Sequence, residues 1–187
     1  MHYPGMIVGP DPDAQLEPLA DHVQVPRYKL FLEARDVALM SQQFSMPESD
    51  LAALAARMPE WMESEGGVED GRLFQWSTEN PQSKYDWYQR GGRFTGSLQL
   101  KQPQQPAGWR RLFGAKPKDR VDQARKSEIQ PELLLANPPT AVLLDGVWHE
   151  CPFTSEPAEL ERWSRRFAEL FASIPDDALL TIMDMHS

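Results

Sequence analysis

The chain has 187 residues, of which 41% are hydrophobic and 25% are charged, and its formal net charge is −9. This composition is typical of one globular domain and excludes wholesale disorder. No apolar run approaches the ~20 residues of a transmembrane helix, and the single cysteine, Cys151, excludes an internal disulfide or a multi-thiolate metal site. We therefore expect a cytoplasmic protein without a cofactor.

The first 26 residues contain five prolines and four acidic residues but no lysine or arginine. Because proline fixes φ and donates no backbone hydrogen bond, residues 1–26 are expected to form an extended or mobile leader. Residues 27–187 are then expected to form a single domain. The two histidines of the leader, His2 and His22, are assigned no role.

Between residues 27 and 100, the sequence predicts three strands and one amphipathic helix. The β-prone segments are 27–34, 73–77 and 93–100. The helix is expected to begin at Ser45, the first residue of the capping-box sequence S-M-P-E, because apolar residues recur after it at helical spacing. Pro59 is expected to end or kink this helix.

The segment 101–126 is strongly basic, with eight Lys/Arg and two acidic residues, so the rest of the chain carries −15. Residues 102–118 are rich in Pro, Gln and Gly and predict a long loop, and residues 119–129 predict a short basic helix. The segment is interpreted either as a solvated insertion or as a binding surface. Its basic patch comprises Arg110, Arg111, Lys116, Lys118, Arg120 and Arg125.

The last third of the chain predicts a hairpin, a helix and a final strand. Asp145-Gly146 favours a type I′ turn, and Ser155 is expected to cap a helix with Pro157 in its first turn. The continuous apolar run at 178–184 suits a central strand that is covered on both faces. Together the elements predict an α+β fold with a single mixed or antiparallel sheet of five or six strands, packed by two amphipathic helices.

The most unusual segment is N-P-Q-S-K-Y-D-W-Y-Q-R-G-G-R-F-T-G at 80–96. One interpretation is the lip of a pocket, in which Trp87 or Tyr88 stacks on a planar ligand while Arg93 holds an anionic group. The other is a structural corner, in which Asp86 caps a turn or pairs with Arg93 and the two glycines form a bulge. The candidate ligand-binding residues are Asp86, Trp87, Tyr88, Gly91, Gly92 and Arg93.

Asp184 and His186 are the candidate catalytic residues. They are two positions apart in the predicted last strand, so their side chains should share one face. A carboxylate beside an imidazole suits general-base chemistry, and the alternative is a solvated, frayed chain end. The four histidines lack the spacing of a dedicated zinc motif, so no metal site is expected.

Four patches of the chain resemble an uncharacterised family found in bacteria and bacteriophages, whose box has the form W-D-W-Y-x-I-G-G-R-W. The resemblance covers residues 73–187 in patches and implies no activity. This sequence has Tyr85, Arg90 and Phe94 where the family pattern has Trp, an aliphatic residue and Trp. The patches are D-W-Y-x-x-G-G-R at 86–93, V-D-Q-A-R at 121–125, D-G-x-W at 145–148 and I-P-D-D-x-L-L-T-x-x-D-x-H at 174–186.

Two functional hypotheses follow, and the first is preferred. The first is a non-catalytic protein-binding protein, such as an immunity-type toxin neutraliser or a phage-borne inhibitor, whose acidic surface attracts a basic toxin or host factor. The second is a small enzyme or nucleotide-binding protein in which the 86–93 box converges with Asp184 and His186. Nucleic-acid binding by the segment 101–126 is disfavoured, because the −15 elsewhere repels phosphate.

Overall fold

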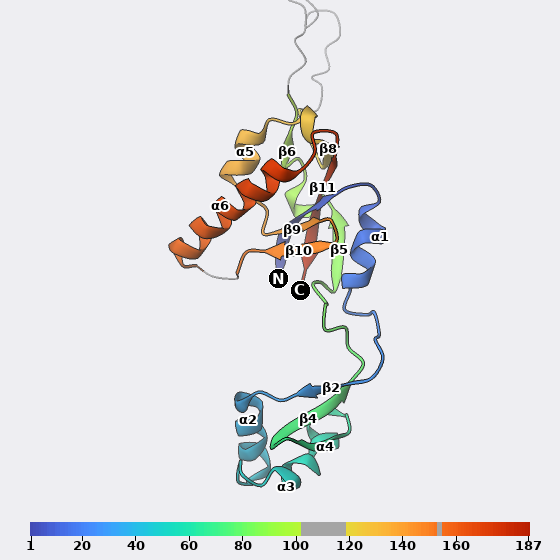
Figure 1. Ribbon diagram of the computed structural model, residues 1–187, viewed down its shortest axis with the longest axis vertical. Coiled ribbons are helices and arrows are strands. Elements are labelled where there is room, and N and C mark those ends of the chain that lie inside the picture. Colours follow the sequence, from blue (N-terminus) through green and yellow to red (C-terminus); the bar gives the residue numbers. More distant parts are fainter. Residues whose placement is uncertain (102–118, 153–154) are drawn as a thin grey trace, which may run out of the picture. The chain divides into compact units, whose positions relative to one another are not determined.

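The computed structural model describes residues 1–101, 119–152 and 155–187, and the chain divides into two compact units. Unit 1 comprises Met1–Ala20 and Gln82–Ser187, and unit 2 comprises Asp21–Pro81. Each unit has its own sheet (Figure 1). Each unit also has its own cluster of buried apolar side chains. This division corrects the prediction of a single domain over residues 27–187, since unit 2 is inserted within the chain of unit 1.

Unit 1 is built on a mixed sheet of six strands, in the order β10-β9-β1-β11-β5, with β8 pairing the other end of β11. Strand β1 runs parallel to β9 and antiparallel to β11, so β1 and β11 lie in the middle of the sheet. The predicted α+β class and the predicted sheet of five or six strands are confirmed. The strands are β1 (His2–Val8), β5 (Trp87–Arg90), β8 (Gln123–Arg125), β9 (Ala141–Leu144), β10 (Val147–Glu150) and β11 (Leu179–His186).

The predicted leader is part of the folded core of unit 1, so this prediction is wrong. Residues 2–8 pair with β11 along its length, and Met6 and Ile7 are fully buried. Two of the five prolines that suggested mobility lie at the starts of helices, where a missing N–H costs little, and Pro4 lies within β1 itself. Pro12 and Pro18 lie in the first turns of α1 (Pro12–Leu16) and the 3-10 helix η1 (Glu17–Leu19).

Helix α6 (Pro157–Ser173) supplies the largest apolar stripe of unit 1. Its Trp163, Phe167 and Phe171 belong to the same buried cluster as Met6 and Ile182 of the sheet. The predicted helix is confirmed, although its N-cap is Glu156 and not Ser155. The predicted final strand is β11, which is buried at six of its eight residues, and the predicted hairpin is β9–β10.

Two further predictions for unit 1 are wrong. Residues 93–100 form the 3-10 helix η2 (Gly92–Phe94) and the short strand β6 (Leu98–Gln99), because the glycines at 91 and 92 turn the chain. Residues 119–129 contain no helix beyond one 3-10 turn. They form β7 (Arg120–Val121), which pairs with β6, then β8 and η4 (Lys126–Glu128), and α5 (Pro131–Ala136) follows.

The basic patch lies largely outside the described residues. Arg110, Arg111, Lys116 and Lys118 fall within 102–118, which the structure does not describe. Arg120 and Arg125 are described, on β7 and β8, and the Arg125 guanidinium donates to the Asp177 carbonyl oxygen over 2.9 Å. The structure therefore leaves the role of the basic segment as a prediction.

Unit 2 is a three-stranded antiparallel sheet, in the order β2-β4-β3, with helices α2, α3 and α4. Met40, Leu54, Met58 and Leu73 form its buried centre. The two predicted strands are confirmed as β2 and β4. The bounds are β2 (Tyr28–Phe31), α2 (Ala34–Phe44), α3 (Leu51–Ala55), α4 (Met58–Met62), β3 (Gly66–Glu69) and β4 (Arg72–Ser77).

The helix predicted to begin at Ser45 is wrong in its boundaries. Ser45 has a φ of 52° and ends α2, which the sequence analysis missed, while the Asp50 carboxylate caps α3. Pro59 lies in the first turn of α4 and so starts a helix instead of ending one. Within the described residues, no helix combines the length and apolarity needed to cross a bilayer.

Candidate functional site

A row of three rings crosses the sheet of unit 1 where strands β1, β11 and β5 lie side by side. The register places His2 opposite His186 and His186 opposite Trp87. Because directly opposed residues of antiparallel strands project from the same face, the three side chains are neighbours. The ring centroids of His2 and His186 are 5.0 Å apart, and those of His2 and Trp87 are 6.0 Å apart, both edge to face. We call His2, His186 and Trp87 the ring row.

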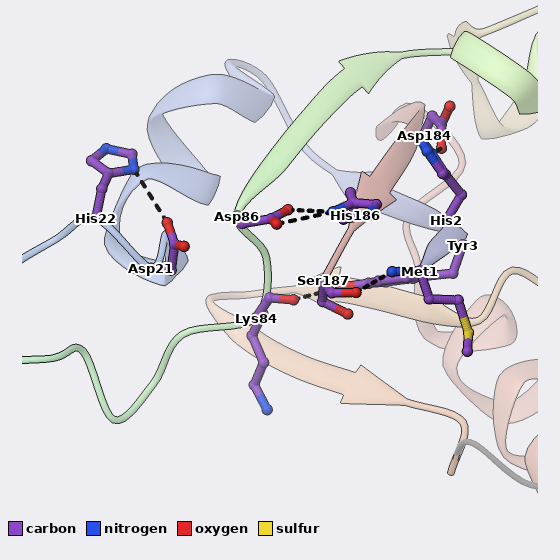
Figure 2. Close-up of polar contacts among 10 residues, drawn as sticks. All are labelled: Met1, His2, Tyr3, Asp21, His22, Lys84, Asp86, Asp184, His186 and Ser187. Carbon is purple, nitrogen blue, oxygen red and sulfur yellow. Dashed lines mark hydrogen bonds and ion pairs between the residues drawn. The ribbon is translucent and has the colours of Figure 1, made fainter. Parts of the chain in front are cut away.

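Each imidazole of the ring row is bonded through its Nδ1 atom to a carboxylate (Figure 2). His2 Nδ1 lies 2.8 Å from Asp184 Oδ1, and His186 Nδ1 lies 2.7 Å and 2.9 Å from the two oxygens of Asp86. Asp184 and His186 are therefore not each other's partners, although both lie on β11. Each pairs with a residue that is distant in sequence.

The environment keeps both carboxylates ionised. Asp184 is only 2% exposed, and burial opposes its ionisation, yet the Arg93 N–H, His2 and the Arg93 charge together lower its pKa. The bond from His186 is the main cause that lowers the pKa of Asp86. Since an ionised carboxylate only accepts hydrogen bonds, each Nδ1 carries the proton of its hydrogen bond, which leaves Nε2 as the other ring nitrogen of each histidine.

The two glycines of the box wrap the chain around two carboxylates. Gly91 and Gly92 have φ of 67° and 50°, and a Cβ added at Gly92 would lie 2.5 Å from Asp184 Oδ2. The Arg93 N–H donates to that oxygen over 2.9 Å, and the Gly96 N–H donates to Asp122 Oδ1 over 2.6 Å. The two glycines turn the chain from the end of β5 into η2, where the structural-corner interpretation expected a bulge. The partner of Asp86 is His186 and not Arg93.

The aromatic residues of the box face in different directions. Trp87 is 47% exposed and belongs to the ring row. Tyr88, the next residue of the strand, points to the opposite face. There its hydroxyl donates to Asp13 Oδ1 over 2.8 Å and its ring packs edge-on against Tyr85. Burial, followed by Asp13, raises the pKa of Tyr88 to about 12, which fits a packing role.

His2 is the residue of this site that the sequence analysis missed. The run M-I-V at 6–8 is a signal that residues 2–8 form a buried strand, and it was outweighed by the nearby prolines. Nothing in the sequence indicates which strand β1 pairs with. The partnership of His2 with Asp184 therefore depends on a pairing between segments more than 170 residues apart.

The remaining histidines and the cysteine do not share these features. His22 is 75% exposed and its Nδ1 lies 3.8 Å from Asp21. Burial, aided by Arg166, lowers the pKa of His149. Burial raises the pKa of the Cys151 thiol, as expected of an unreactive cysteine. In the described part of the chain, no group of three or more His, Cys, Asp or Glu residues is arranged to hold a metal ion.

The carboxylate bonds use Nδ1 of each imidazole and leave Nε2, a nitrogen of the kind that exchanges protons, outside them, and the exposed Trp87 lies beside the two histidines. No protein-family model, curated protein or solved structure matches this chain. The resemblance to a bacterial and phage family stays a prediction, and the site is interpreted from its own geometry.

Proposed function

We propose that the ring row is the general acid–base site of a small enzyme that acts on a ring-containing ligand. The observation that supports this proposal is the pairing of two adjacent imidazoles, from opposite ends of the chain, each with a separate ionised carboxylate. One such pair is common as a structural tie. Two pairs side by side, next to an exposed indole, are what a site needs when one proton is removed and another is delivered.

In this proposal, His2 and His186 carry the protons, and Asp184 and Asp86 are positioning residues. A neutral imidazole accepts a proton at Nε2, and the other imidazole, when protonated, donates one. Each carboxylate fixes the tautomer and the ring orientation through Nδ1, as carboxylates do in catalytic triads. Trp87 stacks on the ligand. The main-chain N–H of Arg93 supports the site indirectly by holding Asp184 in place.

The chemical competence of the imidazoles can be tested with p-nitrophenyl acetate. A neutral imidazole nitrogen attacks the carbonyl carbon of this ester and releases p-nitrophenolate, and water then hydrolyses the acyl-imidazole to acetate. We expect His2→Gln and His186→Gln each to lower the second-order rate constant at pH 7 at least about fivefold. Asp86→Asn should lower the rate and also displace the pH–rate profile. A residue with only a structural role would leave that profile in place.

His22→Gln is the matched control, because His22 is a more exposed histidine that also has an aspartate nearby. This variant should hydrolyse the ester at the wild-type rate. Equal rates in His2→Gln, His186→Gln and the wild-type protein, all folded by circular dichroism, would refute the proposed acid–base site.

A second candidate is the protein-binding function that the sequence favoured, and the charge of unit 2 supports it. Unit 2 contains eleven acidic and five basic residues, a net charge of −6 over 61 residues. Leu39 and Met62 are each 42% exposed on it. An acidic surface with exposed apolar side chains would attract a basic cytoplasmic partner, such as a nuclease-type toxin, and speed its association.

Inhibition of purified basic nuclease domains tests this second candidate. The association rate with an inhibited nuclease should fall several-fold when salt rises from 50 to 300 mM, and should fall again in the charge-reversal variant Glu60→Lys/Glu63→Lys. Salt-independent association, or an unchanged rate in that variant, would speak against an electrostatic docking surface on unit 2.

A further inference from the structure

We infer that the ring row selects a ring-containing ligand that is uncharged or positively charged and disfavours phosphorylated ligands. This inference rests on the proposed function and names the substrate class of the same site. It reverses the expectation that Arg93 holds an anionic group.

The charges of the site are the first step. Asp86 and Asp184 contribute two negative charges that hydrogen-bond the two imidazoles directly. Arg93 contributes one positive charge, which acts on Asp184 and lowers the pKa of that carboxyl group. Together, the Asp86, Asp184 and Arg93 side chains carry a net charge of −1.

In the part of the chain that the structure describes, two other cations near the ring row, Lys84 and the α-ammonium of Met1, are engaged with other groups. The Lys84 ammonium bonds Glu150 over 3.2 Å, and its side chain points away from Asp86 in Figure 2. The α-ammonium of Met1 donates to the Ser187 main-chain oxygen. Neither cation is directed at the space beside the imidazoles. Among the described residues, a phosphate group would therefore meet two carboxylates and a single cation, the Arg93 guanidinium, whose charge already acts on Asp184.

Trp87 acts in the same direction. Its exposed ring lies in one cross-strand row with His186. The negative face of an indole attracts cations as well as apolar rings. A ligand with a ring to stack and an amine to meet the Asp86 carboxylate, itself 45% exposed at the side chain, would satisfy both groups at once.

Three ligands that differ at one position isolate this charge effect: adenosine, adenosine 5′-monophosphate and 5′-amino-5′-deoxyadenosine. The ring and sugar are shared, and the 5′ group is a hydroxyl, a phosphate or an ammonium. Dissociation constants at one ionic strength and pH 7 can be taken from NMR titrations of the Trp87 indole N–H, which is assigned by its loss in Trp87→Phe.

We expect the amine to bind most tightly and the phosphate most weakly, with at least about a tenfold ratio between their dissociation constants in 50 mM salt. That ratio should shrink in Asp86→Asn and at 300 mM salt. The Asp21→Asn variant, which alters the exposed pair with His22, should keep the wild-type ratio.

Equal or tighter binding of the monophosphate would overturn the inference but leave the proposed acid–base site intact, because the ester-hydrolysis variants test that site separately. Failure of all three ligands to shift the Trp87 signal would also overturn it, since the ring-binding surface would then be absent. If neither His2→Gln nor His186→Gln hydrolysed the ester more slowly than the wild-type protein, the proposed function itself would be refuted.

Discussion

Asp184 combines near-complete burial with a negative charge, which proteins accept only where the charge is fully hydrogen-bonded. One oxygen accepts from the Arg93 N–H over 2.9 Å and the other is 2.8 Å from His2 Nδ1. Asp86 makes a similar contact with His186 but is largely solvated. The two aspartates therefore form a matched pair that differs mainly in burial.

Asp184→Asn is expected to lower the free energy of unfolding by about 1–3 kcal/mol, because the new amide leaves a buried hydrogen-bond partner unsatisfied. Asp86→Asn should lower the free energy of unfolding by less than Asp184→Asn does, because the Asp86 pair is exposed to solvent. Urea denaturation followed by circular dichroism gives both values. Equal losses in the two variants would show that burial does not set the contribution of the pair.

The dependence of stability on pH follows from the lowered pKa of both carboxyl groups. A group whose pKa is lower in the folded state adds stability above its unfolded pKa, here 3.8, and that stability is lost as pH falls through the folded pKa. The difference in unfolding free energy between the wild-type protein and Asp184→Asn should therefore narrow between pH 5 and pH 3. A difference that stays constant over that range would contradict the direction of the shift.

At the scale of elements, the corner between β5 and η2 depends on close approach of the backbone to a carboxylate. Gly92→Ala places a methyl group in a left-handed conformation and 2.5 Å from Asp184 Oδ2. Gly146, in the β9–β10 turn, also has a positive φ of 75° but has no atom within 4 Å of an added Cβ. The two glycines share the conformational constraint and differ in the contact.

Gly146→Ala should lower the free energy of unfolding by about 1–2 kcal/mol, which is the penalty of the left-handed conformation alone. Gly92→Ala should cost at least about 1 kcal/mol more, because Asp184 must also move. Thermal or urea unfolding of the two variants measures the difference. Similar losses of unfolding free energy in both variants would mean that the Asp184 side chain can move aside at little energetic cost. The corner would then not fix the position of His2.

The elements with long, regular patterns were predictable from the sequence. Helix α6 repeats apolar residues at helical spacing, β11 is a continuous apolar run, and Asp145-Gly146 specifies its turn by conformation. These signals are local. The residues of the box, Asp184 and His186 were also singled out, because aromatic, glycine and acid–imidazole combinations are chemically unusual.

The partners within the site could not be predicted in the same way. His186 bonds Asp86 across 100 residues, and His2 bonds Asp184 across 182. Such contacts depend on strand order and register, which follow from the packing of the whole sheet. The same reason explains the missed β1: Pro4 within it and Pro10 just after it are local evidence against a strand, whereas its pairing between β9 and β11 is a property of the fold.

At the scale of the whole molecule, the chain enters unit 2 and leaves it through two segments that are hydrogen-bonded to each other. Val25 N–H donates to the Thr78 carbonyl oxygen over 3.0 Å, which ties the two ends of unit 2 together. Within unit 1, the Lys84 N–H donates to the Leu19 carbonyl oxygen over 2.8 Å, and Ala20 bridges Tyr85. Each unit thus closes its own chain ends by main-chain bonds.

Replacement of residues 21–81 by a short Gly/Ser linker should leave unit 1 folded, with the ring row intact. The shortened protein should keep the NMR signals of the His2 and His186 rings and the ester-hydrolysis rate of the full chain within about twofold. It should also lack the −6 charge of unit 2 and, with it, any salt-dependent binding of basic nucleases. A shortened protein that is unfolded by circular dichroism would show that the two units depend on each other.

The central place of β11 has a consequence for how the protein is made. This strand comes later in the chain than every strand it pairs with, so the sheet of unit 1 has a gap between β1 and β5 until the ribosome has synthesised residues 179–186. Unit 2, which is contiguous, has all of its strands available much earlier and can fold during translation. The ring row, which draws on β1, β11 and β5, therefore assembles only after residues 179–186 have been synthesised, later than the sheet of unit 2.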